Sequence, residues 1–273
     1  NAKIRVLFDE PIATNSVTDV KLLRNGTPVA VSAVLTNGNR LVTLTPSGLL
    51  AANAVYTVSA QVRDTSGNVQ AAVFVSTFTT GNDVDLIAPT VIGTSPFYGQ
   101  IGVPLNTIFR VAFSEPIDPL TIDSSSFYVG NAYGQPPIPV SITVAPDRRS
   151  AWLTPTQPLL PYSQYLGTFF NYTDSAGNLG SGVGVYFVTG DAVDATAPVV
   201  STITPPNAAT NVAVNPRVIV AMNEAIDSTS ISRSAPSAAV RAAWSCAAPS
   251  WPRWAPVATI PIPSSTPGGA RAP

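Results

Sequence analysis

The chain has 273 residues, with 14 Lys and Arg against 15 Asp and Glu, no His and one Cys. Histidine is the usual general base and zinc ligand, so its absence excludes Ser-His-Asp and Cys-His catalysis and ordinary zinc sites. Apolar residues make up 45% and charged ones 11%, with a net charge of -1. This balance disfavours a disordered chain, nucleic-acid binding and a polybasic membrane patch, and no apolar stretch approaches the ~20 residues of a spanning helix. We therefore expect a folded, non-enzymatic chain without membrane insertion.

Short strands follow one another from the start of the chain. Ile4, Val6 and Phe8 occupy alternate positions, which is typical of a strand with one buried face. The next strands are predicted at 20–23, 29–35, 41–44, 56–62 and 73–78. No stretch before residue 231 has a convincing helical period. About seven short strands per hundred residues indicates an all-β, Ig-like Greek-key sandwich, in which Tyr56 and Tyr165 would bond their hydroxyls back to the chain.

The same order of motifs recurs after just over one hundred residues. FDEPI at 8–12 returns as FSEPI at 113–117 and, weakened, as MNEAI at 222–226. LTP occurs at 44–46 and 153–155, D-x-x-GN at 64–68 and 174–178, and the junction at 81–89 matches 190–198. We predict tandem sandwiches joined by short linkers. Repeat one spans 1–85 and lacks its first strand, repeat two spans 86–194 and is complete, and a third repeat begins at 195–230. The chain is then a piece of a longer array.

The motifs of repeat two resemble the bacterial Ig-like domain of the S-layer-protein (SbsA-like) type. They are, in order, AP-x-V at 88–91, SP at 95–96, VP-x-N at 103–106, FSEPID at 113–118, LTP at 153–155, Tyr165, D-x-x-GN at 174–178 and F-x-TG at 187–190. The resemblance covers about residues 1–230. It implies an extracellular spacer or adhesive module that occurs in tandem on bacterial surface proteins.

The segment 231–273 departs from this pattern. It has no Asp, Glu, Lys, Phe or Tyr, yet it holds three of the four Trp. Three interpretations remain open: a segment read out of frame, a disordered Ala- and Pro-rich tail, or a binding strip built on Trp244, Trp251 and Trp254.

Acidic residues recur at equivalent places and are the candidate metal ligands. They are Glu10, Asp64, Asp85, Glu115, Asp174 and Asp194. Calcium takes about 6–8 oxygen ligands and needs no histidine, so loop and linker carboxylates suit it. We expect the linker residue Asp85 to approach Glu10 and Asp64 of repeat one. The alternative is turn chemistry, since the Asp of D-x-x-GN accepts bonds from backbone amides, and both roles are compatible.

Two classes of function fit the sequence. The first is a structural or adhesive module of a secreted or cell-surface protein. The second is a carbohydrate-binding accessory module of an extracellular enzyme, in which Phe97, Tyr98, Tyr128 and Tyr133 would stack on sugar rings. The predicted partners are neighbouring Ig-like repeats and a surface polysaccharide or host cell-surface ligand.

Overall fold

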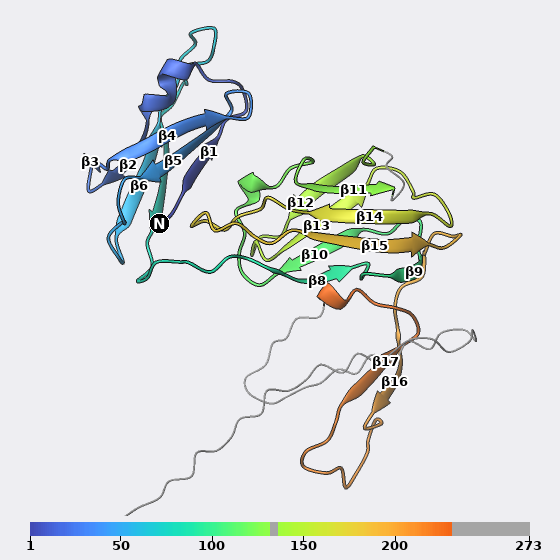
Figure 1. Ribbon diagram of the computed structural model, residues 1–273. Coiled ribbons are helices and arrows are strands. Elements are labelled where there is room, and N and C mark those ends of the chain that lie inside the picture. The colour runs from blue at the N-terminus through green and yellow to red at the C-terminus, as the bar shows by residue number, and fades with distance from the viewer. Residues whose placement is uncertain (132–135, 231–273) are drawn as a thin grey trace, which may run out of the picture. The chain divides into compact units, whose positions relative to one another are not determined.

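The computed structural model describes residues 1–131 and 136–230 (Figure 1). Its regular elements in this part are seventeen strands and three short 3-10 segments, which confirms the all-β prediction. None of the helical segments described there has the length and apolar character needed to cross a membrane. The chain forms two compact units: one contains Asn1–Thr196 and a short piece that starts at Asp227, and the other contains Ala197–Ile226.

Repeat one is a sandwich of a three-stranded and a four-stranded sheet, ordered β1-β5-β4 and β3-β2-β6-β7. Its elements are β1 (Ile4–Leu7), η1 (Thr14–Asp19), β2 (Val20–Arg24), β3 (Thr27–Pro28), β4 (Val31–Thr36), β5 (Leu41–Pro46), β6 (Val55–Ala60) and β7 (Phe74–Thr79). Alternate residues of each sheet point into one core, in which Leu22, Leu44 and Val58 are buried.

Repeat two has two four-stranded sheets, ordered β12-β13-β10-β8 and β11-β14-β15-β9. Its elements are β8 (Val91–Ser95), β9 (Gln100–Val103), β10 (Phe109–Phe113), η2 (Pro119–Thr121), β11 (Phe127–Asn131), β12 (Val140–Val144), β13 (Ser150–Pro155), β14 (Gln164–Phe169) and β15 (Val183–Thr189). Aromatic rings join the sheets: the ring centroids of Phe109 and Phe187 lie 5.0 Å apart, and those of Phe113 and Phe127 lie 6.1 Å apart. These contacts pack the two sheets face to face, so repeat two is an Ig-like sandwich.

The predicted tyrosine corners are present in both repeats. The backbone amide of Ala51 donates to the Tyr56 hydroxyl at 2.9 Å, and that of Leu160 donates to the Tyr165 hydroxyl at 3.0 Å. Each tyrosine is buried at the start of its strand and fixes the preceding loop. The sequence spacing therefore identified both the residue and its bond.

Repeat two contains two opening strands that have no counterpart in the described part of repeat one. β8 pairs antiparallel with β10, and β9 pairs parallel with β15. On β10 the inner residues Phe109, Val111 and Phe113 are at most 3% exposed. The equivalent inner residues of β1 are only half-buried. In the described chain, β1 therefore pairs on one side alone, with β5.

The described part of the second unit is a two-stranded antiparallel sheet. β16 (Val200–Thr204) pairs with β17 (Ile219–Met222), and all five residues of β16 are exposed. Two strands alone cannot enclose a core, so this sheet is marginal by itself. A last 3-10 segment, η3 (Ser228–Ser230), belongs to the first unit. The sequence interpretations of residues 231–273 lie outside the described residues.

Candidate functional site

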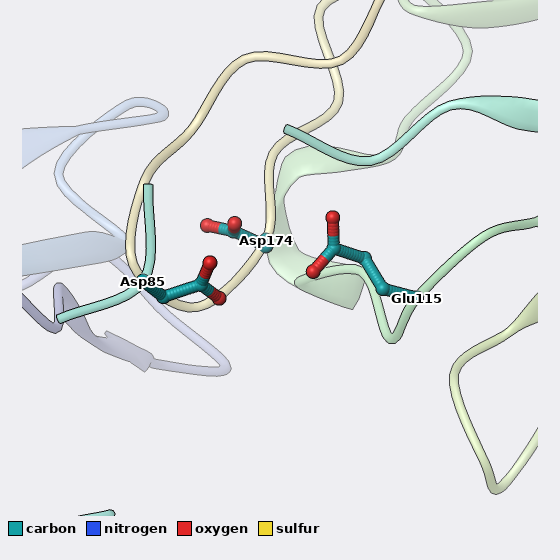
Figure 2. A group of neighbouring side chains, drawn as sticks. All are labelled: Asp85, Glu115 and Asp174. Carbon is teal, nitrogen blue, oxygen red and sulfur yellow. The ribbon is translucent and has the colours of Figure 1, made fainter. Parts of the chain in front are cut away.

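Three of the six predicted carboxylates meet at the linker that precedes repeat two. Asp85 comes from the linker, Glu115 from the turn after β10, and Asp174 from the loop between β14 and β15. Each offers an oxygen, and these oxygens all lie within 4.8 Å of one another. Figure 2 shows the three side chains converging. Asp174 is buried, Glu115 is half-buried and Asp85 is exposed, so the group opens to solvent on the linker side.

Asp174 organises the D-x-x-GN loop. Its Oδ1 accepts from the backbone amides of Gly177 at 2.7 Å and Asn178 at 2.9 Å, while its Oδ2 accepts from Asn178 Nδ2 at 2.7 Å. Asp64 accepts equivalent bonds from Ser66 and Asn68 in repeat one, and these bonds lower the Asp64 pKa. Turn chemistry is therefore confirmed for both loops.

Asparagine side chains hold the linker backbone at Asp85. Asn178 Nδ2 also donates to the Asp85 carbonyl at 3.1 Å and to the Ile87 carbonyl at 3.0 Å. From repeat one, Asn1 Nδ2 donates to the Asp85 carbonyl, and the Asp85 amide donates to Asn1 Oδ1 at 3.2 Å. Asn106 makes the same pair of bonds to Asp194: its Nδ2 donates to the Asp194 carbonyl, and the Asp194 amide donates to its Oδ1. These asparagines were not among the predicted site residues, although the recurring Asn of VP-x-N and D-x-x-GN was the available signal.

The environment of Glu115 disfavours its ionised form. Oε1 is buried and has no hydrogen-bond partner. Burial is the main cause of the raised Glu115 pKa, and the charges of Asp85 and Asp174 raise it further against the opposing effect of Arg149. Three carboxylates around a buried oxygen atom repel one another unless a proton or a cation neutralises them. Oxygen ligands of this kind suit a hard cation such as calcium.

The other three predicted ligands lie outside this group. Asp85 lies beside Glu115 and Asp174 of repeat two, instead of Glu10 and Asp64 of repeat one as we expected. The Asn178 amide ties the linker backbone to the loop of the repeat that follows, while the Asn1 side chain ties it to repeat one. Glu10 is exposed, and Asp64 accepts hydrogen bonds within its own D-x-x-GN loop. Asp194 precedes the third repeat, where it caps Thr196 by accepting from its amide at 2.9 Å.

One protein-family model matches the chain in three places. The model of the family described as "Bacterial Ig-like domain" matches residues 1–80, 85–189 and 194–247, which together cover most of the chain. The chain belongs to the bacterial Ig-like domain family. The resemblance seen in the motifs is thereby confirmed, and the third match continues to residue 247, past the point at which we expected the family pattern to end. Among curated proteins, none matches this chain.

Solved structures similar to these bacterial Ig-like domains include the N-terminal part of the bacterial S-layer protein SbsC. That structure is 19% identical with a TM-score of 0.32, and the match covers 43% of this chain and 26% of the S-layer chain. The chicken CNTN1 FN1–FN3 domains are 12% identical with a TM-score of 0.27, covering 70% of this chain and 64% of that one. The chain thus spans about a quarter of the S-layer protein structure that it matches.

The aromatic candidates on these bacterial Ig-like domains differ in exposure. Phe97 and Tyr98 are 59% and 69% exposed, and the Tyr98 ring meets that of Tyr186 edge-on. Tyr128 is half-buried against Phe170. Tyr133 lies outside the described residues. Of the three predicted aromatics within the described residues, Phe97 and Tyr98 are largely open to solvent.

Glu115→Gln is expected to raise the stability of repeat two in chelator and to reduce the additional stability that calcium provides. The folded-state pKa of Glu115 is raised, so its neutral form contributes stability below the unfolded pKa, and that stability is lost as pH rises through the folded pKa. In chelator near neutral pH, the substitution removes repulsion and stabilises repeat two by up to about 1 kcal/mol. This gain should vanish below about pH 4, where Glu is protonated in both states.

In calcium, the same substitution is expected to reduce the rise in melting temperature, because it takes away one of the three carboxylates that would hold the ion. Thermal melting of the full chain in both media, with Glu10→Gln as the exposed control, measures the effect. A Glu115→Gln chain that responds to calcium as the unmodified chain does would contradict the assignment of Glu115 as a ligand.

Proposed function

We propose that this chain is a non-catalytic, extracellular structural or adhesive module, a spacer of tandem Ig-like domains within a larger bacterial surface or secreted protein. The observation that carries the proposal is the threefold match to the bacterial Ig-like domain along one chain. Tandem sandwiches extend a protein by repetition and place function in end loops and linkers. The lack of histidine supports the absence of acid-base catalysis.

Contacts across the linker support the spacer role. Arg5 of β1 forms an ion pair with Asp118 of repeat two, and both side chains are 11% exposed. The Lys3 amide donates to the Ser175 carbonyl at 2.9 Å. Together with the bonds from Asn178, these contacts resist bending between the two repeats. A spacer needs this resistance because a freely jointed chain would not hold a distal domain at a fixed distance.

Calcium at Asp85, Glu115 and Asp174 is part of the proposal. The ion would neutralise the three carboxylates and tie the linker to the loop of repeat two. Only the ordered state has all three ligands together, so binding would stabilise it, by roughly 2.7 kcal/mol at a hundredfold excess of free ion over the dissociation constant. The hydrogen bonds of Asp174 do not exclude this role, because a carboxylate oxygen has more than one lone pair.

Other copies of the repeat are the proposed partners along the chain, and a surface polysaccharide or host cell-surface ligand is the proposed external partner. Phe97 and Tyr98 support the second proposal, because exposed aromatic rings offer flat apolar faces to a ligand. In an accessory module of an enzyme the same rings would hold a carbohydrate.

Labelling of intact cells tests the extracellular location. Antibody raised against the full chain should stain unbroken cells of the encoding bacterium, or detect the protein in the culture medium, and external protease should remove the signal. An antigen that becomes accessible only after lysis would refute the proposed location, whatever the outcome of the calcium experiments.

A further inference from the structure

Two side chains at the start of β10 in repeat two contact the beginning of the next repeat. Asn106 precedes β10, and its side chain makes two bonds to the backbone of the linker residue Asp194, at 2.7 and 2.9 Å. Arg110 of β10 forms an ion pair with Asp227, in which Nη1 lies 2.6 Å from Oδ2. Asp194 and Asp227 both belong to the compact unit that contains repeat two. The strand therefore contacts the following segment at two points.

Repeat one makes the same two contacts with repeat two. Asn1 makes the corresponding pair of bonds to the linker residue Asp85, and Arg5 pairs with Asp118. In both repeats the Asn stands four residues before the Arg, and the linker Asp stands 33 residues before the Asp of the ion pair. Arg5 and Arg110 each stand three residues before the Phe that opens FDEPI or FSEPI. The two contacts therefore recur at the same spacing on both sides of the junction.

The aspartate of each ion pair divides its carboxylate between two partners. Oδ1 of Asp118 accepts from the Leu120 amide at 3.0 Å at the start of η2. Oδ1 of Asp227 likewise accepts from the Thr229 amide at 2.8 Å within η3. In both residues it is Oδ2 that contacts the arginine of the repeat before. Capping of the turn needs one oxygen, so it does not account for the arginine at the other oxygen.

The sheet of repeat two positions Arg110 for this contact. The guanidinium lies 5.0 Å from the ring centroid of Trp152, which is its cross-strand partner on β13. This cation–π contact restricts the arginine before any partner binds. A Cβ added at Gly93 of the neighbouring strand β8 would lie 3.6 Å from Cγ2 of Thr229, so η3 rests beside the arginine. The docking surface thus consists of Asn106, Arg110, Trp152 and Gly93.

We propose, on the basis of the spacer function above, that the Asn and Arg of this strand form a docking surface whose partner is a following repeat with Asp at one position. That position is the sixth of FSEPID at 113–118 and of MNEAID at 222–227. Repeat one has Ala13 there, so it offers no carboxylate to such a surface. Repeat three has Ile219 where the arginines stand. Repeat one therefore supplies only the arginine, repeat two supplies both groups, and repeat three supplies only the aspartate, which sets the order of the repeats.

Disulfide closure between Gly93→Cys and Thr229→Cys, in a full-length Cys246→Ser chain, tests the docking. The contact between the two positions brings them within reach of a disulfide, and its equilibrium in glutathione buffers reports how often the turn is docked. Arg110→Gln should lower the closure constant about two- to fivefold, the range for a partly exposed ion pair. Arg24→Gln is the matched control, because Arg24 also lies over an aromatic ring, but in repeat one. It should leave the constant unchanged.

Asp227→Asn tests the partner from the other side and alters no core residue of repeat two. It keeps an oxygen for the Thr229 amide and removes the charge, so it should lower the closure constant as much as Arg110→Gln does. The two changes together should lower it no further, because each breaks the same ion pair. Equal constants in Arg110→Gln and Arg24→Gln, or effects of the two single changes that add in full, would overturn the proposal. Staining of intact cells tests the location of the spacer separately, since it does not depend on this disulfide.

Discussion

Phe127→Ala is expected to lower the free energy of unfolding of repeat two by about 3–5 kcal/mol. Phe127 is fully buried, and its ring lies 6.1 Å from Phe113, 5.2 Å from Phe169 and 5.7 Å from Tyr172 by centroid distance. The substitution removes one of the rings that join the two sheets and leaves a cavity. Urea unfolding of the full chain, followed by circular dichroism, measures the loss.

The transition of repeat one should stay unchanged, because the two repeats have separate buried cores. Leu160→Ala is the control: Leu160 is 62% exposed, so its loss should alter stability by less than about 0.5 kcal/mol. A shift of both transitions by Phe127→Ala would show that the repeats unfold as one unit.

Asp174→Ala is expected to destabilise repeat two by about 2–3 kcal/mol, because it leaves buried donors without their charged acceptor. The residue is 2% exposed and accepts from two amides and the Asn178 side chain. Asp64→Ala removes the same bonds from a more exposed loop, where water can replace them, so its effect should be smaller. Chemical denaturation of the two full-length variants provides the comparison, and a larger loss for Asp64→Ala would contradict it.

Asp174→Asn distinguishes the role of Asp174 in its turn from its proposed role as a calcium ligand. The side-chain oxygen of Asn can still accept from the backbone amides of Gly177 and Asn178, whereas the negative charge and the bond from Asn178 Nδ2 are lost. This variant should lose less stability in chelator than Asp174→Ala, because it keeps the two backbone bonds, and it should respond less to calcium in thermal melting. An unchanged calcium response would leave Asp174 with its turn role alone.

The fold and the tyrosine bonds could be predicted from the sequence because they depend on local patterns. Alternation at Ile4, Val6 and Phe8 identifies a strand, and a tyrosine six residues after a leucine identifies the corner. The composition of the carboxylate group could be predicted only in part. Spacing alone identified Asp85, Glu115 and Asp174 as candidates, but the position of the linker depends on the bonds that Asn1 and Asn178 make to its backbone.

The sequence pattern also could not predict how exposed each candidate residue is. Glu10 and Glu115 occupy the same motif position, yet Glu10 is exposed and Glu115 has a buried oxygen. Glu115 lies beside Asp85 of the linker and Asp174 of the following loop, and this placement could not be inferred from the motif. A repeated motif therefore predicts the turn, whereas the residues around it determine whether its carboxylate is buried or exposed.

The distance distribution between two spin labels, one in repeat one and one in repeat two, tests the central claim that the linker is held in place. Labels at Val34→Cys and Leu160→Cys, in a full-length Cys246→Ser chain, occupy exposed positions outside the linker network. We predict a narrow distribution in calcium that broadens in Asn178→Ala, which loses the bonds to the carbonyls of Asp85 and Ile87. A distribution that is equally broad in both chains, with and without calcium, would contradict the account.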